Sequence, residues 1–289
     1  MNRLPFLAQR LFNRPLCILP GKAEVIMAAL ADRFGVTRFF HGVQPVALSP
    51  YDPEDEEAGY HDDPRPYGVI EGVGIIPIHG TLVAKLGTMR PYSGMTGYDG
   101  IRVVLQQALA DDEVRAIVLD VDSPGGECAG MFDLADMIYA ARGTKPIWSI
   151  LNEEAYSAGY ALASAADRVI VPRTGGTGSV GVIMLHSDLS QALSKEGITV
   201  TLIRFGAQKF EGNPYEPLSE TALAGLQADA NYFGELFVDL VARHRGLSAA
   251  AVRATQAACF TGPAGVAIGF ADEVMAPDAA FAALLDTLS

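Results

Sequence analysis

Two kinds of hydrophobic pattern alternate along the chain. Residues 116–121 form an apolar run interrupted only by Asp120, which is typical of a strand buried on both faces of a sheet. Residues 99–110 instead place their apolar side chains on one face of a helix. Because strand and helix patterns of these kinds follow each other from about residue 68 onward, the sequence predicts an α/β fold with a largely parallel sheet.

The same reading gives the remaining elements. Apolar residues at roughly helical spacing predict a helix near the N-terminus, over residues 23–34, and a long helix after Ser219. A third helix is expected over residues 131–142, ended by Gly143. Further strands are predicted over residues 73–78, 146–151, 168–171, 180–185 and 198–203.

Composition divides the chain into three regions. Residues 1–48 are expected to form a small helical extension. Residues 49–67 hold four prolines and seven acidic side chains, a combination that indicates an acidic linker or arm. Residues 68–289 have the composition of a compact domain, and we expect one domain there.

Charge and cysteine content exclude several classes of protein. The 289 residues include 21 basic and 34 acidic side chains, for a net charge of −13, which argues against a general nucleic-acid binder. The longest uncharged stretch, residues 254–271, contains a proline and three glycines and does not suit a membrane span. Three cysteines without ligand spacing predict neither a disulfide framework nor a metal site. We therefore expect a soluble protein that is not exported.

Glycine clusters mark the candidate chemistry. Gly125 and Gly126 directly follow a predicted strand, where paired glycines turn two N–H groups toward one point and could hold an oxyanion. A tight turn explains the same residues. A second cluster, residues 174–181, lacks the lysine of a nucleotide-binding loop and precedes a strand, so it is expected to line a cleft.

Ser157 lies between these clusters, near the start of a predicted helix. There the helix dipole favours an anionic nucleophile, although a helix-capping serine has the same position. A serine nucleophile needs a base. His186 with nearby Asp188 could complete a triad. Lys209, among aromatic and small residues, could act instead if it lies in a low-dielectric pocket, and a loop lysine in water is the simpler interpretation.

Four ordered motifs resemble the signal peptide peptidase A / protease IV family. They are Asp-Ser-Pro-Gly-Gly, Tyr-Ser-Ala-Gly-Tyr-Ala-Leu-Ala-Ser-Ala-Ala-Asp, Thr-Gly-Ser-Val-Gly-Val and Gly-x-x-Lys-Phe, and the resemblance covers about residues 70–275. It implies a ClpP/crotonase-like fold and a serine peptidase with a Ser–Lys dyad that needs no metal or organic cofactor. It also implies a homo-oligomer, a ring or a dome, and in some members the serine and the lysine come from adjacent protomers.

The family's functional roles carry over to seven positions. By this resemblance, Ser157 is the nucleophile and Lys209 is the general base that takes its proton, while His186 becomes structural. The oxyanion-hole loop falls on Gly125 and Gly126. Ser179 is the serine that orients the lysine, and Gly178 and Tyr156 contact the substrate.

The N-terminal region is similar to one branch of that family. Asn-Arg-Pro-Leu at residues 13–16, the following helix and the acidic arm resemble the capsid assembly (prohead) proteases of phages. This branch implies that the substrates are capsid, portal or scaffold proteins, cleaved during head maturation in the host cytoplasm or the prohead. Members can continue into a scaffold segment, whereas this sequence stops at Ser289, so we expect any scaffolding function to come from a separate protein or a longer product.

Three other interpretations stay open at this stage. One is a ClpP-like peptidase that uses Ser157 with His186 and Asp188. Another is a crotonase-type acyl-CoA enzyme, for which the carboxylates near the glycine loop are Asp120, Asp122 and Glu127. The last is a catalytically silent capsid-assembly protein.

Overall fold

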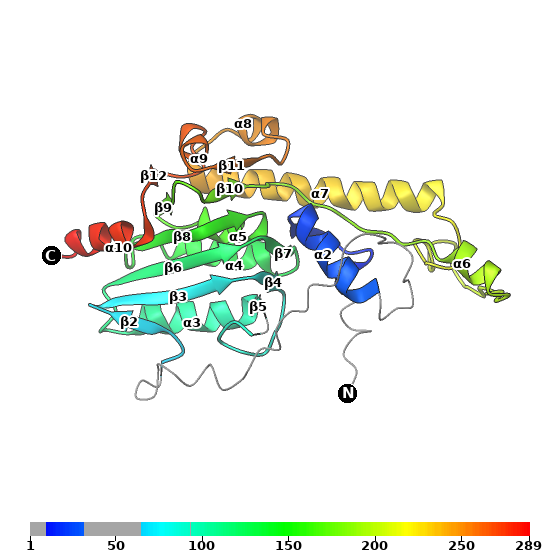
Figure 1. Cartoon of the computed structure of the whole chain (residues 1–289), viewed down its shortest axis with the longest axis horizontal. Helices are drawn as coiled ribbons and strands as arrows, with labels where there is room; N and C mark the ends of the chain where they lie inside the picture. The colour runs from blue at the N-terminus through cyan, green and yellow to red at the C-terminus, as the bar shows by residue number, and fades with distance from the viewer. Residues whose placement is uncertain (1–9, 32–64, 93) are drawn as a thin grey trace.

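A computed structural model describes residues 10–31, 65–92 and 94–289 (Figure 1). The end of the N-terminal extension and most of the acidic arm, residues 32–64, therefore lie outside the described residues. Within the part of the chain that the structure describes, no helix is long and apolar enough to cross a bilayer.

A mainly parallel sheet forms the centre of the fold. Its three longest strands, β3 (Val73–His79), β6 (Ala116–Ser123) and β8 (Ile147–Tyr156), pair in parallel in that order. The other strands are β2 (Gly68–Ile70), β9 (Arg168–Val171), β10 (Gly176–Gly178), β11 (Cys259–Thr261) and β12 (Glu273–Val274). The order is β11–β10–β8–β6–β3–β2, with β9 joining β8 to β12. The predicted α/β class with a largely parallel sheet is confirmed.

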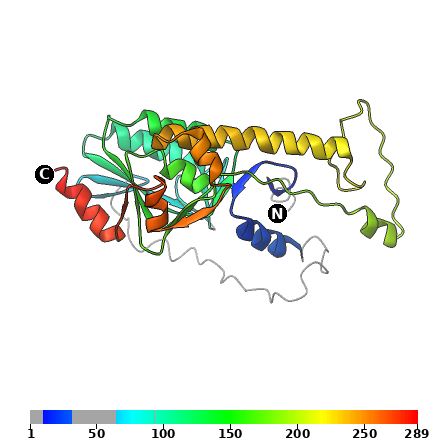
Figure 2. The ribbon, with the colours of Figure 1, turned by 90° about the horizontal axis from the view of Figure 1, so that it is seen from above.

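Helices cover both faces of this sheet (Figures 1 and 2). On one face, Val118 and Ile150 pack against Leu284 of α10 (Pro277–Asp286). The opposite face packs against α3 (Tyr98–Ala110), α4 (Met131–Ala140), α5 (Ala158–Ala163) and α7 (Glu220–Arg245). The remaining described helices are α2 (Pro20–Ala31), α6 (Ser190–Lys195), α8 (Ala249–Ala254) and α9 (Pro263–Ala267).

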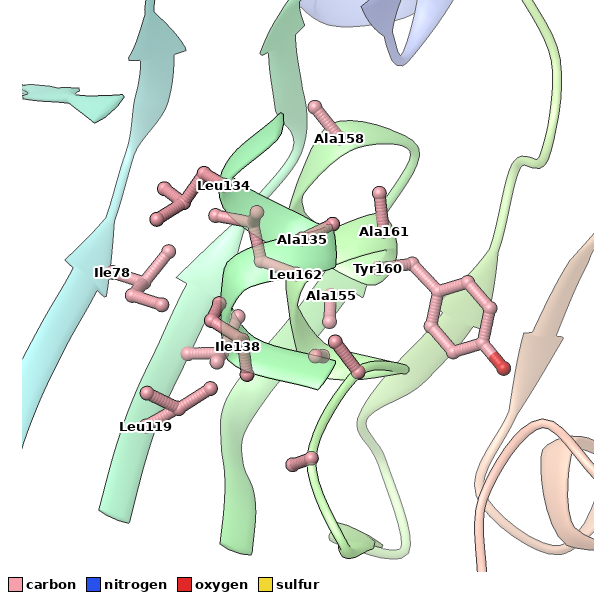
Figure 3. Close-up of a cluster of buried hydrophobic side chains, with 14 of the residues drawn as sticks. Ile78, Leu119, Leu134, Ala135, Ile138, Ala155, Ala158, Tyr160, Ala161 and Leu162 are labelled. Atoms are coloured by element: carbon pink, nitrogen blue, oxygen red, sulfur yellow. The ribbon is translucent and has the colours of Figure 1, made fainter. Parts of the chain in front are cut away.

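Small side chains let α5 enter the core beside the sheet. Ala158 and Ala161 are fully buried, and Figure 3 shows α5 beside Leu134 and Ile138 of α4. Tyr160 points the other way and donates a hydrogen bond to the carbonyl oxygen of Phe270, with an O···O distance of 2.8 Å. The predicted helix that begins next to Ser157 is therefore a short, fully packed element.

A second, smaller sheet lies at the end of the main one. Its strands are β1 (Leu16–Ile18), β4 (Thr81–Val83), β5 (Met95–Gly97) and β7 (Gly125–Glu127), in the order β1–β7–β4–β5. The N-terminal extension thus contributes a strand to this sheet before it enters α2. The helix predicted over residues 23–34 begins earlier, at Pro20, and is described as far as Ala31.

Most predicted elements are confirmed within a few residues, but two predicted strands are wrong. Residues 180–185 make only isolated bridges, and residues 198–203 form no strand. The second segment belongs to an arm formed by residues 190–219, which extends with α7 away from the sheet (Figures 1 and 2). In this arm Ile203 is 97% exposed and Phe205 is 99% exposed, so its apolar pattern does not reflect burial within the chain.

The side chain of His244, near the end of α7, is buried where the sequence predicts an exposed one. A charged helix end predicts a solvated side chain, but His244 is only 3% exposed and stacks on Tyr139 with ring centroids 4.7 Å apart. Its Nδ1 lies 3.1 Å from the hydroxyl of Ser164. Burial, followed by the charges of Arg243 and Arg142, lowers the pKa of His244 to about 3.

We expect the thermal midpoint of unfolding to fall as the pH decreases from about 6.5 toward 3. Between these values the unfolded chain binds a proton at His244 that the folded chain does not bind, so this contribution is complete above pH 6.5 and decreases by up to about 1.4 kcal/mol per pH unit below it. Thermal scans of the wild type and His244→Gln check this. The variant should lose less stability over the window, and equal losses would contradict the assignment.

Candidate active site

Ser157 occupies the tight turn between β8 and α5. Its backbone has φ 53° and ψ −118°, a conformation that costs a non-glycine residue energy and tends to mark functional positions. Its amide donates to the carbonyl oxygen of Gly178, with an N···O distance of 2.8 Å. The central sheet therefore fixes this turn through the parallel pairing of β8 with β10.

The hydroxyl of Ser157 is buried and has no hydrogen-bond partner within the described residues. The residue is 1% exposed. Buried hydroxyls in proteins are normally paired, and an unpaired one calls for an explanation. A nucleophile that finds its base only in a larger assembly is one such explanation.

The predicted oxyanion loop lies directly against Ser157. Gly125 has φ +104°, and a Cβ atom at this position would lie 2.9 Å from Cβ of Ser157, so only glycine fits. Gly126 is equally restricted, because a Cβ atom there would collide with the carbonyl oxygen of Leu82. The structure thus brings both predicted glycines to the candidate nucleophile.

Ser123 directs this loop, and sequence reasoning missed it. Its hydroxyl donates to the carbonyl oxygen of Gly80 at 2.7 Å and accepts from the amide of Gly125 at 3.1 Å. The amide of Gly125 is therefore already used inside the loop, which leaves Gly126 as the better oxyanion donor of the predicted pair. A hydroxyl two residues before the first glycine was the available signal in Asp-Ser-Pro-Gly-Gly.

Replacing Ser123 with alanine is expected to destabilise the fold by about 1–3 kcal/mol, because the buried amide of Gly125 and the half-buried carbonyl of Gly80 lose this partner. We also expect kcat to fall more than KM rises, since the loop that holds the transition state loses its support. Urea unfolding and steady-state kinetics measure the two effects. Ser123→Thr, which keeps the hydroxyl, is the matched variant, and equal kcat losses in both would contradict the hydrogen-bond role.

The second glycine cluster, residues 174–181, contacts the turn at Ser157 through the carbonyl oxygen of Gly178. Gly178 has φ +106° and pairs with Tyr156 in the sheet. Ser179 is buried and donates its amide to the carbonyl oxygen of Ala258 at 2.9 Å. The Tyr156 ring lies against Gly176, where a Cβ atom would collide with its hydroxyl. The structure places all these positions beside Ser157 in the chain or the sheet, and their roles toward lysine and substrate stay predictions.

Lys209 is not brought to Ser157 within one chain. It lies in the exposed arm, where its amide donates to the carbonyl oxygen of Gly206 in a turn. The strand that we expected to precede it, residues 198–203, is absent. Because the hydroxyl of Ser157 has no partner in the described chain, a Ser–Lys pair requires another copy or a movement of the arm.

The alternative triad is not formed either. Nδ1 of His186 lies 3.1 Å from the side-chain oxygen of Asn13. A carboxylate oxygen of Asp188 accepts from the amide of Ser190 at 2.8 Å, and hydrogen bonds from Ser190 lower the pKa of Asp188. His186 therefore contacts the N-terminal segment and pairs with neither Ser157 nor Asp188.

Two of the three carboxylates near the loop, Asp120 and Glu127, have structural partners. Asp120 lies 2.9 Å from Nε2 of His79, and this hydrogen bond raises the pKa of His79. Glu127 accepts from the amide of Ala84 at 2.6 Å. Burial raises the pKa of Glu154, and Asp122 raises it further. Asp120 and Glu127 are therefore already paired, which argues against the carboxylate chemistry of a crotonase-type acyl-CoA enzyme.

The described residues form no metal site at Ser157. In residues 10–31, 65–92 and 94–289 no group of three metal-ligating side chains comes together. A cavity of about 640 Å³ lies beside β7 and is lined by Arg10, Arg14, Pro15, Ala84, Glu127, Cys128, Ala129 and Phe233. The N-terminal segment thus contributes part of its lining, a feature that the sequence did not predict.

Comparisons with known proteins point to a peptidase family. A sequence model described as peptidase family S49 matches residues 140–288. The chain is 42% identical over 268 residues to the head-tail preconnector protein GP5 of Enterobacteria phage P21, covering 91% of this chain and 54% of that protein. It is 39% identical over 293 residues to the capsid assembly protease C of Escherichia phage lambda, covering 100% of this chain and 67% of that protein.

More distant similarities extend beyond phages. Protease 4 of Haemophilus influenzae is 23% identical over 210 residues, which is 72% of this chain and 33% of that protein. Among solved structures, an enoyl-CoA hydratase from Shewanella pealeana aligns with 77% of this chain and 72% of its own at 12% identity and a TM-score of 0.47. The chain spans about half the length of the P21 protein and two thirds of the lambda protein.

Proposed function

The chain belongs to peptidase family S49, and on this premise we propose that it is a Ser–Lys endopeptidase that cleaves phage capsid, portal or scaffold proteins during head maturation. The names of the relatives from phages P21 and lambda, a head-tail preconnector and a capsid assembly protease, support the phage role. The observation that carries the chemistry is Ser157, strained at the strand–helix turn, buried, without a hydrogen-bond partner and packed against Gly125.

In the proposed mechanism, the neutral amine of Lys209 takes the proton from the Ser157 hydroxyl. The oxygen attacks the peptide carbonyl carbon, and the amide of Gly126 donates a hydrogen bond to the oxyanion that forms. The carbon–nitrogen bond breaks as the leaving amine receives the proton from Lys209. Water then loses a proton to Lys209 and attacks the ester carbon. The bond from this carbon to the Ser157 oxygen breaks, and that oxygen takes the proton back from Lys209.

We further propose that Lys209 reaches Ser157 of a neighbouring protomer in a homo-oligomer. The arm that carries Lys209 extends from the domain and exposes Ile203 and Phe205 almost completely. Exposed apolar side chains of this kind mark interaction surfaces. Docking of the arm on an adjacent copy would cover them and would desolvate the lysine amine, as a general base requires.

The test is cleavage of a denatured protein by the full chain between pH 5 and pH 9, with and without EDTA. Because the base must be a neutral amine, we expect activity to rise with pH, and because serine chemistry needs no metal, EDTA should leave it unchanged. A rate that is flat from pH 5 to pH 9, or that is lost with EDTA and restored by a metal, would overturn the proposal.

A further inference from the structure

The N-terminal strand β1 lies along the oxyanion loop. It pairs antiparallel with β7 in a register that sets Cys17 opposite Gly126 and Ile18 opposite Gly125. Hydrogen bonds at both ends fix this register. The amide of Leu19 donates to the carbonyl oxygen of Pro124 at 2.9 Å, and the amide of Cys128 donates to the carbonyl oxygen of Pro15 at 3.4 Å.

Antiparallel ladders alternate between hydrogen-bonded and non-bonded pairs. The bonded positions on either side therefore make Cys17 and Gly126 the bonded pair between them. In this pair the carbonyl oxygen of Cys17 accepts from the amide of Gly126. This amide is the donor assigned above to the oxyanion, so the chain's own carbonyl fills that position.

The other edge of the strand is paired as well. Leu16 and Ile183 exchange two backbone hydrogen bonds of 2.9 Å, and the amide of Asn13 donates to Leu185 at 2.8 Å. Residues 13–19 are thus held between two backbone edges. Extended peptides bind in the same way when they add a strand to a protein sheet.

The peptide bond between Cys17 and Ile18 and the side chain of Ser157 both lie next to Gly125. A Cβ atom at Gly125 would collide with the carbonyl oxygen of Cys17, and it would lie 2.9 Å from Cβ of Ser157 and 3.0 Å from Cα of Ile18. These groups therefore meet at one point beside the glycine loop. Ser157 itself is only 1% exposed.

The side chains of β1 fill separate pockets. Cys17 is 0% exposed, and its Sγ lies 2.8 Å from Sγ of Cys128. Leu16 and Ile18 belong to a different cluster that includes Ile183. An incoming peptide in this register would therefore place a small side chain against Cys128 and branched apolar side chains on either side.

We propose that residues 13–19 are an intramolecular pseudosubstrate: β1 occupies the peptide-binding groove beside Ser157, and a substrate enters only when β1 leaves. This inference rests on the proposed peptidase function of the same site. A tethered segment competes as a ligand at an effective concentration of about millimolar. Capsid assembly would then activate the enzyme wherever it withdraws the N-terminal segment.

The first test uses the two cysteines to lock β1 in place. Diamide, a two-electron oxidant, removes both thiol hydrogens and joins Cys17 to Cys128, and peptide mapping by mass spectrometry verifies the bond. We expect the oxidised full chain to lose at least tenfold in cleavage rate and to recover with dithiothreitol. Cys259→Ala, which removes the exposed cysteine, should behave like the wild type, whereas Cys17→Ala should show no loss on oxidation. A fully cross-linked protein that cleaves as fast as the reduced protein would overturn the proposal.

The second test does not depend on activity. A fluorescent peptide with the sequence of residues 13–20 is titrated into full-length Ser157→Ala protein, with and without Ile18→Asp, which puts a charge into a buried position of β1. We expect Ile18→Asp to tighten binding at least tenfold, and Val25→Asp, at an exposed position of α2, to leave it unchanged. Equal affinities in the two proteins would overturn the proposal. Tighter binding in Ile18→Asp, together with no cleavage by an Ile18→Asp chain that keeps Ser157, would support the groove and reject the peptidase function.

Discussion

Replacing Ser157 with alanine is expected to abolish cleavage of a denatured protein, with a loss of about 10³-fold or more in kcat/KM. The acyl-enzyme cannot form without the hydroxyl, and the remaining groups only bind and orient the peptide. The structure adds a second expectation. Because this hydroxyl makes no hydrogen bond in the described chain, its removal should leave the thermal midpoint unchanged or slightly raised.

Ser149→Ala is the matched control for this experiment. Ser149 is a buried serine in β8, the strand that leads to Ser157, and its hydroxyl donates to the carbonyl oxygen of Ala163 at 3.0 Å. Its replacement should lower the thermal midpoint and leave cleavage largely intact, which is the opposite result. Residual cleavage by Ser157→Ala near the wild-type rate would show that another group is the nucleophile.

The local parts of the site could be predicted from sequence because each depends on neighbouring residues. The run at residues 116–121 is buried on both faces in the sheet, and β6 was predicted from it. The glycines at 125 and 126 follow that strand directly, so their place at the end of the sheet also followed. The strand and the helix on either side of Ser157 were predicted in the same way, whereas its role as the nucleophile rests on the family resemblance.

The contacts between distant segments could not be predicted in this way. Cys17 and Cys128 are 111 positions apart, and nothing in their spacing indicates that their sulfur atoms meet. Residues 198–203 have a strand-like pattern, but Ile198, Val200 and Ile203 are exposed. The predicted strand was wrong because an apolar pattern does not show whether the side chains are buried within one chain or between chains. His244 was misjudged because its basic neighbours suggested solvent, while packing against Tyr139 buries it.

Mixing two inactive variants is expected to restore cleavage if Ser157 and Lys209 come from different protomers. Lys209→Ala assemblies and Ser157→Ala assemblies should each be inactive. When subunits exchange at random in a 1:1 mixture, about one quarter of the sites pair an intact serine with an intact lysine from the neighbour, as a head-to-tail interface between copies requires. Activity should therefore rise from near zero to about one quarter of the wild-type rate.

Subunit exchange must be shown independently, by energy transfer between labelled subunits, before the mixture is interpreted. Lys195 is another lysine of the same arm, in α6. The Lys195→Ala variant should stay active alone, which would show that the loss in Lys209→Ala comes from the missing base and not from damage to the arm. If exchange is complete and the mixture stays inactive, both groups act within one chain, and the arm must fold back onto its own Ser157. The unpaired hydroxyl of Ser157 would then mark a resting state in which β1 holds the groove before the arm closes.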